Sequence, residues 1–334
     1  MKIIIDVMSG DNAPEEIIKG VFMAHEEYPD VDMVLTGNKY IIEDYCREAG
    51  YDLDDPALSV VHTEAVITME DPALSVVREK TDSSMGKGLK MLSAGEADAM
   101  VSAGNTGALH AGSTLVVRRI KGIGRSAIAT ILPLETPMLL IDAGANTEVT
   151  KEQLLQFAIM GSIYMNKIFG IESPRVGLAN NGTESTKGTK LLQEAHLHLS
   201  ECENINFVGN IEGKQIPFSE CDVLVCDGFT GNMILKLTEG LAKFFMGKVK
   251  QVFMRTPATK AAGLVMKPQI KEFKKQFDAS EYGGAPLLGI SKPVIKAHGS
   301  SDAVAIKNAI RQTIDFVNTG IIKELARQVQ KKED

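Results

Sequence analysis

Five short stretches of this chain share one pattern: an apolar strand runs into Gly, Asn, Asp, Ser or Thr residues, and a helix follows. They lie at residues 3–11, 99–107, 139–146, 223–232 and 294–302. In a parallel α/β sheet such turns fall at the carboxyl edge of the strands, where ligands bind. Glycine lets backbone N–H groups approach an anion, and a helix start adds about half a positive charge. The pattern therefore predicts turns that gather around a small, oxygen-rich anion.

Composition narrows the class of protein. The chain has 334 residues, of which 44% are hydrophobic and 24% charged, as expected for one large or two ordinary soluble domains. A formal net charge of −7 argues against general nucleic-acid binding, which needs a basic surface. The four cysteines lack CxxC spacing, so we expect reduced thiols and a cytoplasmic protein.

Neither a targeting segment nor a membrane span is expected. The first six residues already read as a strand, and no apolar run approaches the roughly 18–20 residues that cross a bilayer.

Strand-like runs alternate with helical patterns along the whole chain. This alternation predicts an α/β fold with a doubly wound, mostly parallel sheet in a three-layer sandwich, over residues 1–334 as a single domain. Pro14 precedes a predicted helix at Glu15–Glu27, and a second long helix is predicted at Lys151–Phe169. Besides the strands of the five repeated patterns, we expect strands at Asp32–Thr36, Leu58–His62, Ala127–Leu132, Arg175–Ala179 and Ile205–Val208.

One segment interrupts this alternation. Residues 243–275 hold nine Lys or Arg and a single acid, Glu272, and Pro257 and Pro268 divide them into pieces. We expect a basic, amphipathic helical hairpin that protrudes over residues 243–280. It is either a solvated charged face or a dock for an acidic partner protein or an anionic membrane surface. The residues assigned to docking are Arg255, Lys260, Leu264, Val265, Lys267 and Lys271.

The turn after residues 99–101 is the most suited to an anion. Asn105 or Thr106 can cap the following helix, which leaves other N–H groups free for a ligand, although an ordinary tight turn has the same composition. The candidate binding residues here are Ser102, Gly104, Asn105, Thr106 and Gly107.

The turn after Arg175–Ala179 adds a lysine. Lys187 follows Asn180, Gly182 and Glu184, which we expect to bind substrate or phosphate. The Lys187 ammonium can neutralise phosphate or a developing oxyanion. The alternative is an ordinary surface lysine. No Walker pattern is present, so ATP or GTP is not the expected ligand.

Two further turns carry side chains with catalytic potential. Asn232, before a helix expected to begin near Met233, can donate to a carbonyl oxygen, whereas Asp227 in the same turn can be only a turn former. His298 precedes a helix start that we expect Ser300 or Ser301 to cap, and the helix dipole there favours a neutral imidazole. A structural histidine is the alternative.

Several common chemistries lack their patterns. His196 and His198 are two residues apart on a predicted helix and therefore make a poor metal pair. There is no H-E-x-x-H, no G-x-S-x-G and no G-x-G-x-x-G after the first strand. Neither a metal nor a nicotinamide or other cofactor is expected.

Six motifs, taken together and in order, resemble those of the bacterial phosphate acyltransferase family, the acyl-ACP:phosphate transacylases known as PlsX. Two positions depart from the family pattern: Ser9 where glycine is common, and Asn12 where histidine is common, so Asn12 receives no catalytic role. The matching motifs lie at residues 6–14, 102–108, 142–146, 227–232, 282–285 and 296–302.

The resemblance implies transfer of a long-chain acyl group from acyl carrier protein to inorganic phosphate, giving acyl phosphate for phospholipid synthesis. It further implies a fold like the isocitrate and isopropylmalate dehydrogenases, a homodimer, and peripheral association with the inner face of the cell membrane. A membrane glycerol-3-phosphate acyltransferase would then use the acyl phosphate.

On this reading, phosphate attacks the thioester directly and no metal takes part. We expect the catalytic residues to be Lys187, Asn232 and His298. The remaining motif residues are expected to bind substrate or phosphate: Asp6, Gly10, Asp11, Asp142, Gly144, Asn146, Gly228, Thr230, Gly231, Gly299, Ser300 and Ser301, with Asp227.

Other functions stay open at this point. A phosphotransacetylase-like enzyme would use acyl-CoA in place of the carrier protein. A non-catalytic scaffold would bind acyl phosphate or carrier protein without turnover. A dehydrogenase follows from fold analogy alone.

Overall fold

A computed structural model describes residues 1–276 and 279–330. The strands are β1 Lys2–Asp6, β2 Asp32–Gly37, β3 Leu58–His62, β4 Ala99–Ser102, β5 Ala127–Leu132, β6 Met138–Ile141, β7 Arg175–Asn180, β8 Asn206–Glu212, β9 Val223–Val225, β10 Ala285–Leu288 and β11 Val294–Lys296. The helices are α1 Glu15–Glu27, α2 Lys39–Ala49, α3 Ser84–Ala94, α4 Thr106–Gly112, α5 Lys151–Phe169, α6 Lys190–Ser200, α7 Gly228–Phe253, α8 Pro257–Val265, α9 Lys267–Gln276, α10 Ala303–Asn318 and α11 Ile321–Gln330.

Within these residues the strands form one eleven-stranded sheet, in the order β3-β2-β1-β4-β11-β10-β5-β6-β9-β7-β8. Pairing is parallel from β3 to β11 and again from β6 to β8. Between these halves, β10 runs antiparallel to both β11 and β5, and β5 runs antiparallel to β6. Three reversals leave the two halves pointing in opposite directions. The prediction of a mostly parallel α/β sheet is confirmed.

The expectation that all the glycine-rich turns share one carboxyl edge is wrong. The turns after β1, β4 and β11 lie at one edge of the sheet, and those after β6, β7 and β9 lie at the other. We call these the β1–β4–β11 edge and the β6–β9–β7 edge. Short loops explain the reversal of direction. Residues 133–137 connect β5 to β6, and residues 289–293 connect β10 to β11; both loops are too short for the crossover that a parallel pair of strands needs.

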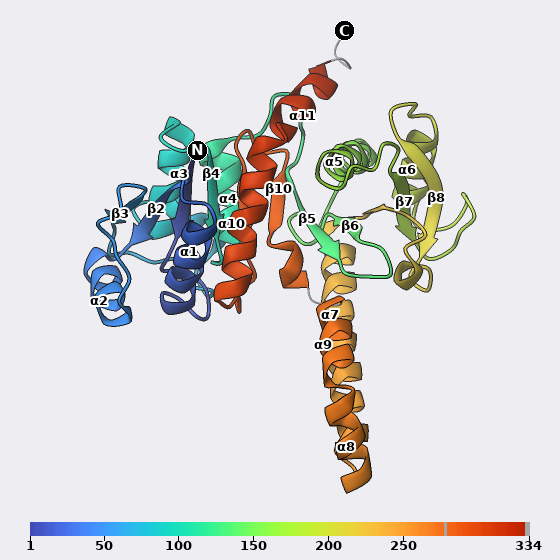
Figure 1. Cartoon of the computed structure of the whole chain (residues 1–334). Coiled ribbons are helices and arrows are strands. Elements are labelled where there is room, and N and C mark those ends of the chain that lie inside the picture. The colour runs from blue at the N-terminus through green and yellow to red at the C-terminus, as the bar shows by residue number, and fades with distance from the viewer. Residues whose placement is uncertain (277–278, 331–334) are drawn as a thin grey trace.

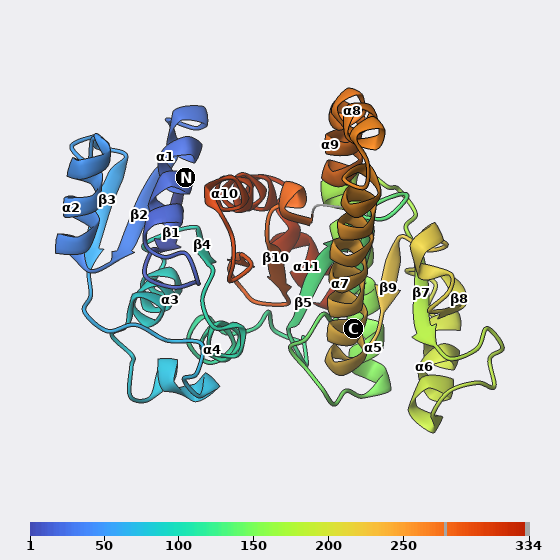
Figure 2. The same ribbon diagram turned by 90° about the horizontal axis from the view of Figure 1, so that it is seen from below.

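Both faces of the sheet are covered, which gives three layers. Ile3 and Ile5 pack into one apolar cluster with α1, α5 and α10, whereas Ile4 between them packs into a second cluster with α3 and α4. This alternation follows from the two-residue period of a strand. Figure 2 shows α1 and α10 on one side of β1 and β4, and α3 and α4 on the other.

Local signals fixed several boundaries. Helices α1 and α5 have the predicted bounds, and α5 begins with a capping box in which Thr150 and Gln153 exchange hydrogen bonds. Two boundaries differ from expectation by four or more residues. Helix α7 begins at Gly228 and not near Met233, because Asp227 caps it. Strand β8 extends to Glu212 and not to Val208.

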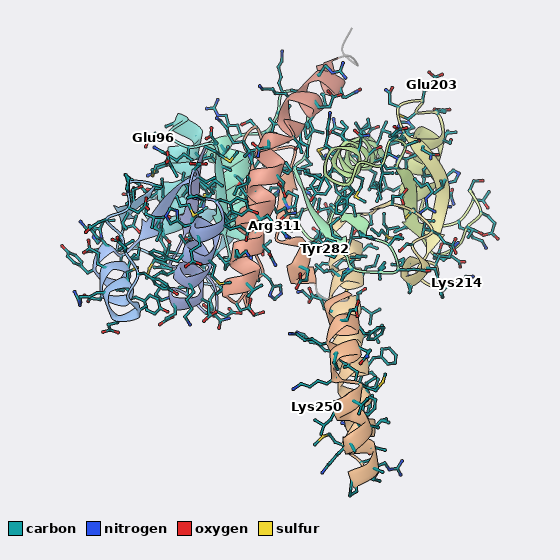
Figure 3. All side chains as sticks on the ribbon, viewed as in Figure 1. Glu96, Glu203, Lys214, Lys250, Tyr282 and Arg311 are labelled. Atoms are coloured by element: carbon teal, nitrogen blue, oxygen red, sulfur yellow. The ribbon has the colours of Figure 1, made fainter. Side chains whose placement is uncertain are left out.

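The basic segment lies in the long projection of the molecule. Figure 1 shows α7, α8 and α9 leaving the sheet side by side, and Gly263 of α8 lies against Phe253 of α7. Lys250, labelled in Figure 3, lies on this projecting part of α7. Across the described ranges, no helix has both the length and the apolar character that a membrane crossing requires.

Two mid-helix glycines test the packing of this fold. A Cβ at Gly20 of α1 would lie 2.5 Å from the Ile306 Cβ of α10, whereas a Cβ at Gly240 of α7 would meet nothing within 4 Å. Gly20→Ala should therefore lower the free energy of unfolding by about 1–3 kcal/mol through overpacking. Gly240→Ala should raise it by about 0.5–1 kcal/mol, since alanine restricts the unfolded chain. Urea unfolding of both variants measures the difference; equal effects would contradict the α1–α10 packing.

Candidate functional site

The three turns of the β1–β4–β11 edge contact one another. The Asp11 N–H donates to the Gly299 carbonyl at 2.8 Å, and the Ala297 N–H donates to the Ser102 carbonyl at 3.0 Å. The Asn12 amide donates to the carbonyls of Ser300 and Ser301. Gly10, with φ of +121°, lies against Ala103 and Gly299, where a larger residue would be strained. Sequence-predicted residues from three strands therefore meet here.

A buried polar layer supports these turns from below. The Ser102 hydroxyl donates to a carboxylate oxygen of Asp6 at 2.7 Å and accepts from the Gly104 N–H. Asp6 is fully buried, and burial raises the pKa of its carboxyl, while the hydroxyls of Ser102, Ser84 and Ser9 act to lower that pKa. Asp6 and Ser102 were expected to bind substrate, but their burial gives them a supporting role.

The Asn105 side chain also bonds to the backbone of the protein through both its oxygen and its amide group. Its side-chain oxygen accepts from the Ala108 N–H as the cap of α4, as predicted. Its amide group donates to the carbonyls of Thr68, Met69 and Asp71. The groups left facing outward in this turn are the first N–H groups of α4, at Thr106 and Gly107, which have no partner within a helix.

His298 is exposed at the same edge. Its Nδ1 accepts the Ser300 N–H at 3.2 Å and lies 2.9 Å from the Ser300 hydroxyl oxygen. Because a backbone N–H points at Nδ1, the neutral ring carries its proton on Nε2, which is free to donate. Partial desolvation lowers the pKa of His298, and the positive charge of Lys236 acts in the same direction.

The cap of the helix after His298 differs from expectation. Asp302, and not Ser300 or Ser301, caps α10, because its carboxylate accepts the Ala305 N–H at 2.9 Å. The Ser300 hydroxyl instead pairs with His298, and Ser301 is buried. Ser300 is therefore exposed beside the histidine.

Sequence reasoning missed two lysines whose charges act on this site. Lys296 ends β11 and is buried, with only 8% of its surface exposed, and Lys236 of α7 influences the pKa of both Lys296 and His298. A lysine within the apolar run Val294–Ala297 was a usable signal for the first. No local pattern marks Lys236, since it reaches this edge only through the path of α7.

At the β6–β9–β7 edge, both oxygens of the Asp142 carboxylate accept hydrogen bonds from the protein itself. One oxygen of Asp142 accepts N–H groups of Ile128, Gly144 and Ala145, and the other accepts both the N–H and the side-chain amide of Asn146. Asp142 is fully buried and Asn146 nearly so. Both were expected to bind phosphate, but these contacts make them the framework of the turn.

The start of α7 packs onto that framework. The Gly228 N–H donates to the Asn146 carbonyl at 2.7 Å, and a Cβ at Gly231 would lie 1.8 Å from the Asp142 oxygen, so only glycine fits. Asp227 accepts the N–H and the hydroxyl of Thr230, which confirms the turn-forming alternative for this residue. Asn232, the fifth residue of the helix, is exposed and lies next to Gly144.

Lys187 lies in the third turn of this edge. Asn180 holds the turn closed, with its amide on the Lys187 carbonyl at 3.3 Å, and the Glu184 carbonyl accepts the Lys187 N–H. The Lys187 side chain is exposed and crosses Gly182. Lys187 therefore lies beyond β9 from Asn232, at the edge opposite His298.

The three expected catalytic residues are thus divided between the two edges, and α7 connects them. The helix starts at the β6–β9–β7 edge, and Lys236 lies one turn, roughly 6 Å, beyond Asn232 toward His298. The central strands have only three to six residues, so the edges are roughly 10–20 Å apart.

The electrostatics differ between the edges. The β1–β4–β11 edge has Lys296, Lys236 and the starts of α3, α4 and α10, together with Asp6 and Asp11. The β6–β9–β7 edge has Lys187 and the start of α7, together with Asp142 and Asp227, whose oxygens have N–H partners of their own. With two lysines against one, the β1–β4–β11 edge favours an anion more. Among the residues that the structure describes, no three His, Cys, Asp or Glu side chains could together hold a metal ion.

Comparison with known proteins gives the family. The family model described as "Fatty acid synthesis protein" matches residues 1–324. A phosphate acyltransferase of Alkaliphilus oremlandii is 46% identical over 335 residues, covering 100% of this chain and 99% of the relative. The chain belongs to the phosphate acyltransferase family. A second relative, from Clostridium novyi, is 44% identical and carries the same name, with 99% of each chain covered.

The chain is therefore an acyltransferase, and acyl transfer to or from phosphate is its chemistry. A solved phosphotransacetylase from Streptococcus pyogenes shares the fold, with a TM-score of 0.64 and 17% identity over 95% of this chain and 94% of that one. A phosphate acyltransferase needs a phosphate site, which agrees with the anion-favouring edge described above.

A Lys187 variant tests whether the β6–β9–β7 edge takes part in the reaction. Lys187→Ala should lower acyl phosphate formation by at least about tenfold if its ammonium neutralises charge during transfer. The melting temperature should stay unchanged, because the side chain is exposed. Lys190→Ala, which removes another exposed lysine three residues further on, is the matched control. Turnover at the Lys190→Ala level would remove Lys187 from the chemistry.

Proposed function

We propose that this enzyme transfers a long-chain fatty acyl group from acyl carrier protein to inorganic phosphate, producing acyl phosphate for phospholipid synthesis. The observation that carries the proposal is the β1–β4–β11 edge, where glycine turns, Lys296, Lys236 and His298 gather in a member of the phosphate acyltransferase family. The proposed phosphate position is on the outward N–H groups of these turns, at Gly10, Thr106, Gly107 and Gly299.

The reaction needs no covalent enzyme intermediate. A phosphate oxygen attacks the thioester carbonyl carbon, a C–O bond forms, and the carbonyl oxygen becomes an oxyanion. The C–S bond then breaks, and the carrier leaves as a thiolate that takes up a proton; a thiol with pKa near ~8.5 leaves readily. The protein must hold two reactants together, which is worth roughly 7–11 kcal/mol of the barrier, and stabilise the oxyanion.

His298 has the geometry for the second task. Its Nδ1 is occupied by Ser300, so the Nε2–H of the neutral ring points a single donor toward the acyl oxygen. Its lowered pKa keeps the ring neutral at pH 7. Asn232 and Lys236 are four residues apart on α7, which runs from the β6–β9–β7 edge toward this one, and they are proposed to flank the thioester arm.

The experiment offers the purified enzyme palmitoyl-carrier protein or palmitoyl-CoA, each with inorganic phosphate, and measures acyl phosphate. We expect the carrier protein to be the better donor by kcat/KM. His298→Ala should lower kcat by about 10²–10³ while KM for phosphate changes little, since one oxyanion donor is lost. Preference for acyl-CoA would instead support the phosphotransacetylase-like activity. No acyl phosphate from either donor would overturn the proposal.

The projecting helices offer a surface for an acidic partner or membrane. Leu264 and Val265 near the end of α8 are 73% and 75% exposed, and Arg255, Lys260 and Lys267 are exposed around them. Apolar side chains ringed by positive charge are typical of helices that lie in the headgroup region of anionic membranes. This arrangement supports peripheral attachment at the inner face of the cell membrane, with Lys271 of α9 adding charge.

Membrane attachment through α8 gives a direct test. Leu264→Glu should abolish most co-sedimentation with phosphatidylglycerol vesicles, because the apolar end can no longer enter the interface. Leu197→Glu, an equally drastic change at an exposed leucine of α6, should leave vesicle binding intact. Charge reversal at Arg255, Lys260 and Lys267 should likewise weaken binding, or raise the KM for the carrier protein. Unaltered binding and KM in all these variants would exclude the projection as a docking surface.

A homodimer is also proposed, on the apolar face of α7. Side chains at four-residue and three-residue spacing along one side of this helix are exposed in the single chain: Phe229, Met233, Leu237, Leu241 and Phe244. A continuous apolar stripe of this length is what a second copy of the helix would cover.

Acyl phosphate made at the membrane would pass to a membrane glycerol-3-phosphate acyltransferase.

A further inference from the structure

Lys296 is a buried cation to which the proposed reaction assigns no function of its own. It is the last residue of β11, between Ile295 and Ala297, and only 8% of it is exposed. Burial of an ammonium is costly unless hydrogen bonds or opposite charge compensate it. The surroundings of Lys296 therefore indicate what the charge is for.

The ammonium holds two backbone carbonyls. Its Nζ donates to the Ala103 carbonyl oxygen at 3.2 Å and to the Ala297 carbonyl oxygen. These carbonyls belong to the turns after β4 and β11, so Lys296 ties two of the three turns together. Among the described residues no carboxylate forms an ion pair with it; Asp6 and Asp11 act on it only at longer range.

These bonds fix the direction of two peptide groups. In a trans peptide the N–H points opposite to the C=O, so an Ala297 carbonyl turned toward Lys296 directs the His298 N–H away from it. The Ala103–Gly104 peptide is held at both ends, by Lys296 at the carbonyl and by the Ser102 hydroxyl at the Gly104 N–H. Neither turn can rotate its peptide without losing a bond to a buried group.

We propose that Lys296 is a positioning residue for inorganic phosphate: it turns the Ala297 carbonyl inward so that the His298 N–H faces outward, it holds the turn after β4 in place through the Ala103 carbonyl, and its unpaired charge attracts the anion. The inference rests on the proposed function only in naming phosphate as the anion.

Four groups from the surrounding elements act on this charge. Asp6 from β1 and Asp11 from the turn after β1 favour the ammonium, whereas Lys236 from α7 opposes it, and His298 of the same turn lies within electrostatic range. Burial outweighs the carboxylates and lowers the pKa of Lys296 to about 8. A bound anion prefers the protonated lysine, so phosphate affinity should fall as the pH rises through this pKa.

Stability should change in the opposite direction. Because the folded pKa lies below the value of about 10.4 in an unfolded chain, the unfolded state binds more protons between these values. The contribution of Lys296 to the free energy of unfolding therefore increases as the pH rises across that interval. A loss of phosphate affinity in the same interval cannot be attributed to unfolding caused by this group.

The test is calorimetric binding of inorganic phosphate to the full-length protein at about pH 7 and about pH 9, with sulfate as an anion of constant charge. The wild type should lose about tenfold in affinity for both anions between these values. Lys296→Arg should keep its affinity over the same range, because a guanidinium stays protonated. Lys296→Met should bind at least about tenfold more weakly at pH 7, without a pH dependence.

Lys292→Met, two residues before the start of β11, is the matched control and should bind like the wild type. Wild-type phosphate affinity in a folded Lys296→Met variant would overturn the inference. If that variant does not fold, the wild-type profile decides, and a flat affinity for both anions between the two pH values would overturn it. Turnover by the wild type tests the proposed function separately, since phosphate affinity can be measured without an acyl donor.

Discussion

The backbone pairing of β10 determines where ligands can bind in this molecule. Strand β10 hydrogen-bonds to β11 and to β5, and it runs against both. Together with the antiparallel β5–β6 pair, it reverses the direction of half of the sheet. Each half then has its own carboxyl edge, with its own glycine turns and helix starts. Helix α7 begins at one edge and runs toward the other. Its path places Lys236 where its charge acts on Lys296 and His298.

The two edges use similar sequences for different purposes. At the β6–β9–β7 edge, Asp142 and Asp227 direct their oxygens to N–H groups of their own turns, and this self-sufficient network positions the start of α7. At the β1–β4–β11 edge, the buried groups are Asp6 and Lys296, and they hold the turns from below. A turn can bind an anion when its own hydrogen-bond acceptors do not occupy its N–H groups. The residue composition of a turn does not reveal where those acceptors point.

Local chemistry was predictable from the sequence, and long-range pairing was not. The bounds of α1 and α5 follow from Pro14, the Thr150 capping box and apolar spacing, all within a few residues. Strand β10 was not predicted, because its four residues carry no period of their own and are specified by β11 and β5. The short connections at 133–137 and 289–293 did contain the information that their flanking strands are antiparallel. Among the site residues, Asn105 was identified as a cap from local pattern, whereas Lys296 requires knowledge of which turns lie above it.

The central claim is that the β1–β4–β11 edge holds inorganic phosphate. Amide resonances of the ¹⁵N-labelled protein, followed during titration with phosphate, test it most directly. The account predicts that the amide resonances of Gly107 and Gly299 shift and saturate together, while those of Gly144 and Gly182 stay in place. Saturating shifts at Gly144 and Gly182, with none at Gly107 and Gly299, would contradict it.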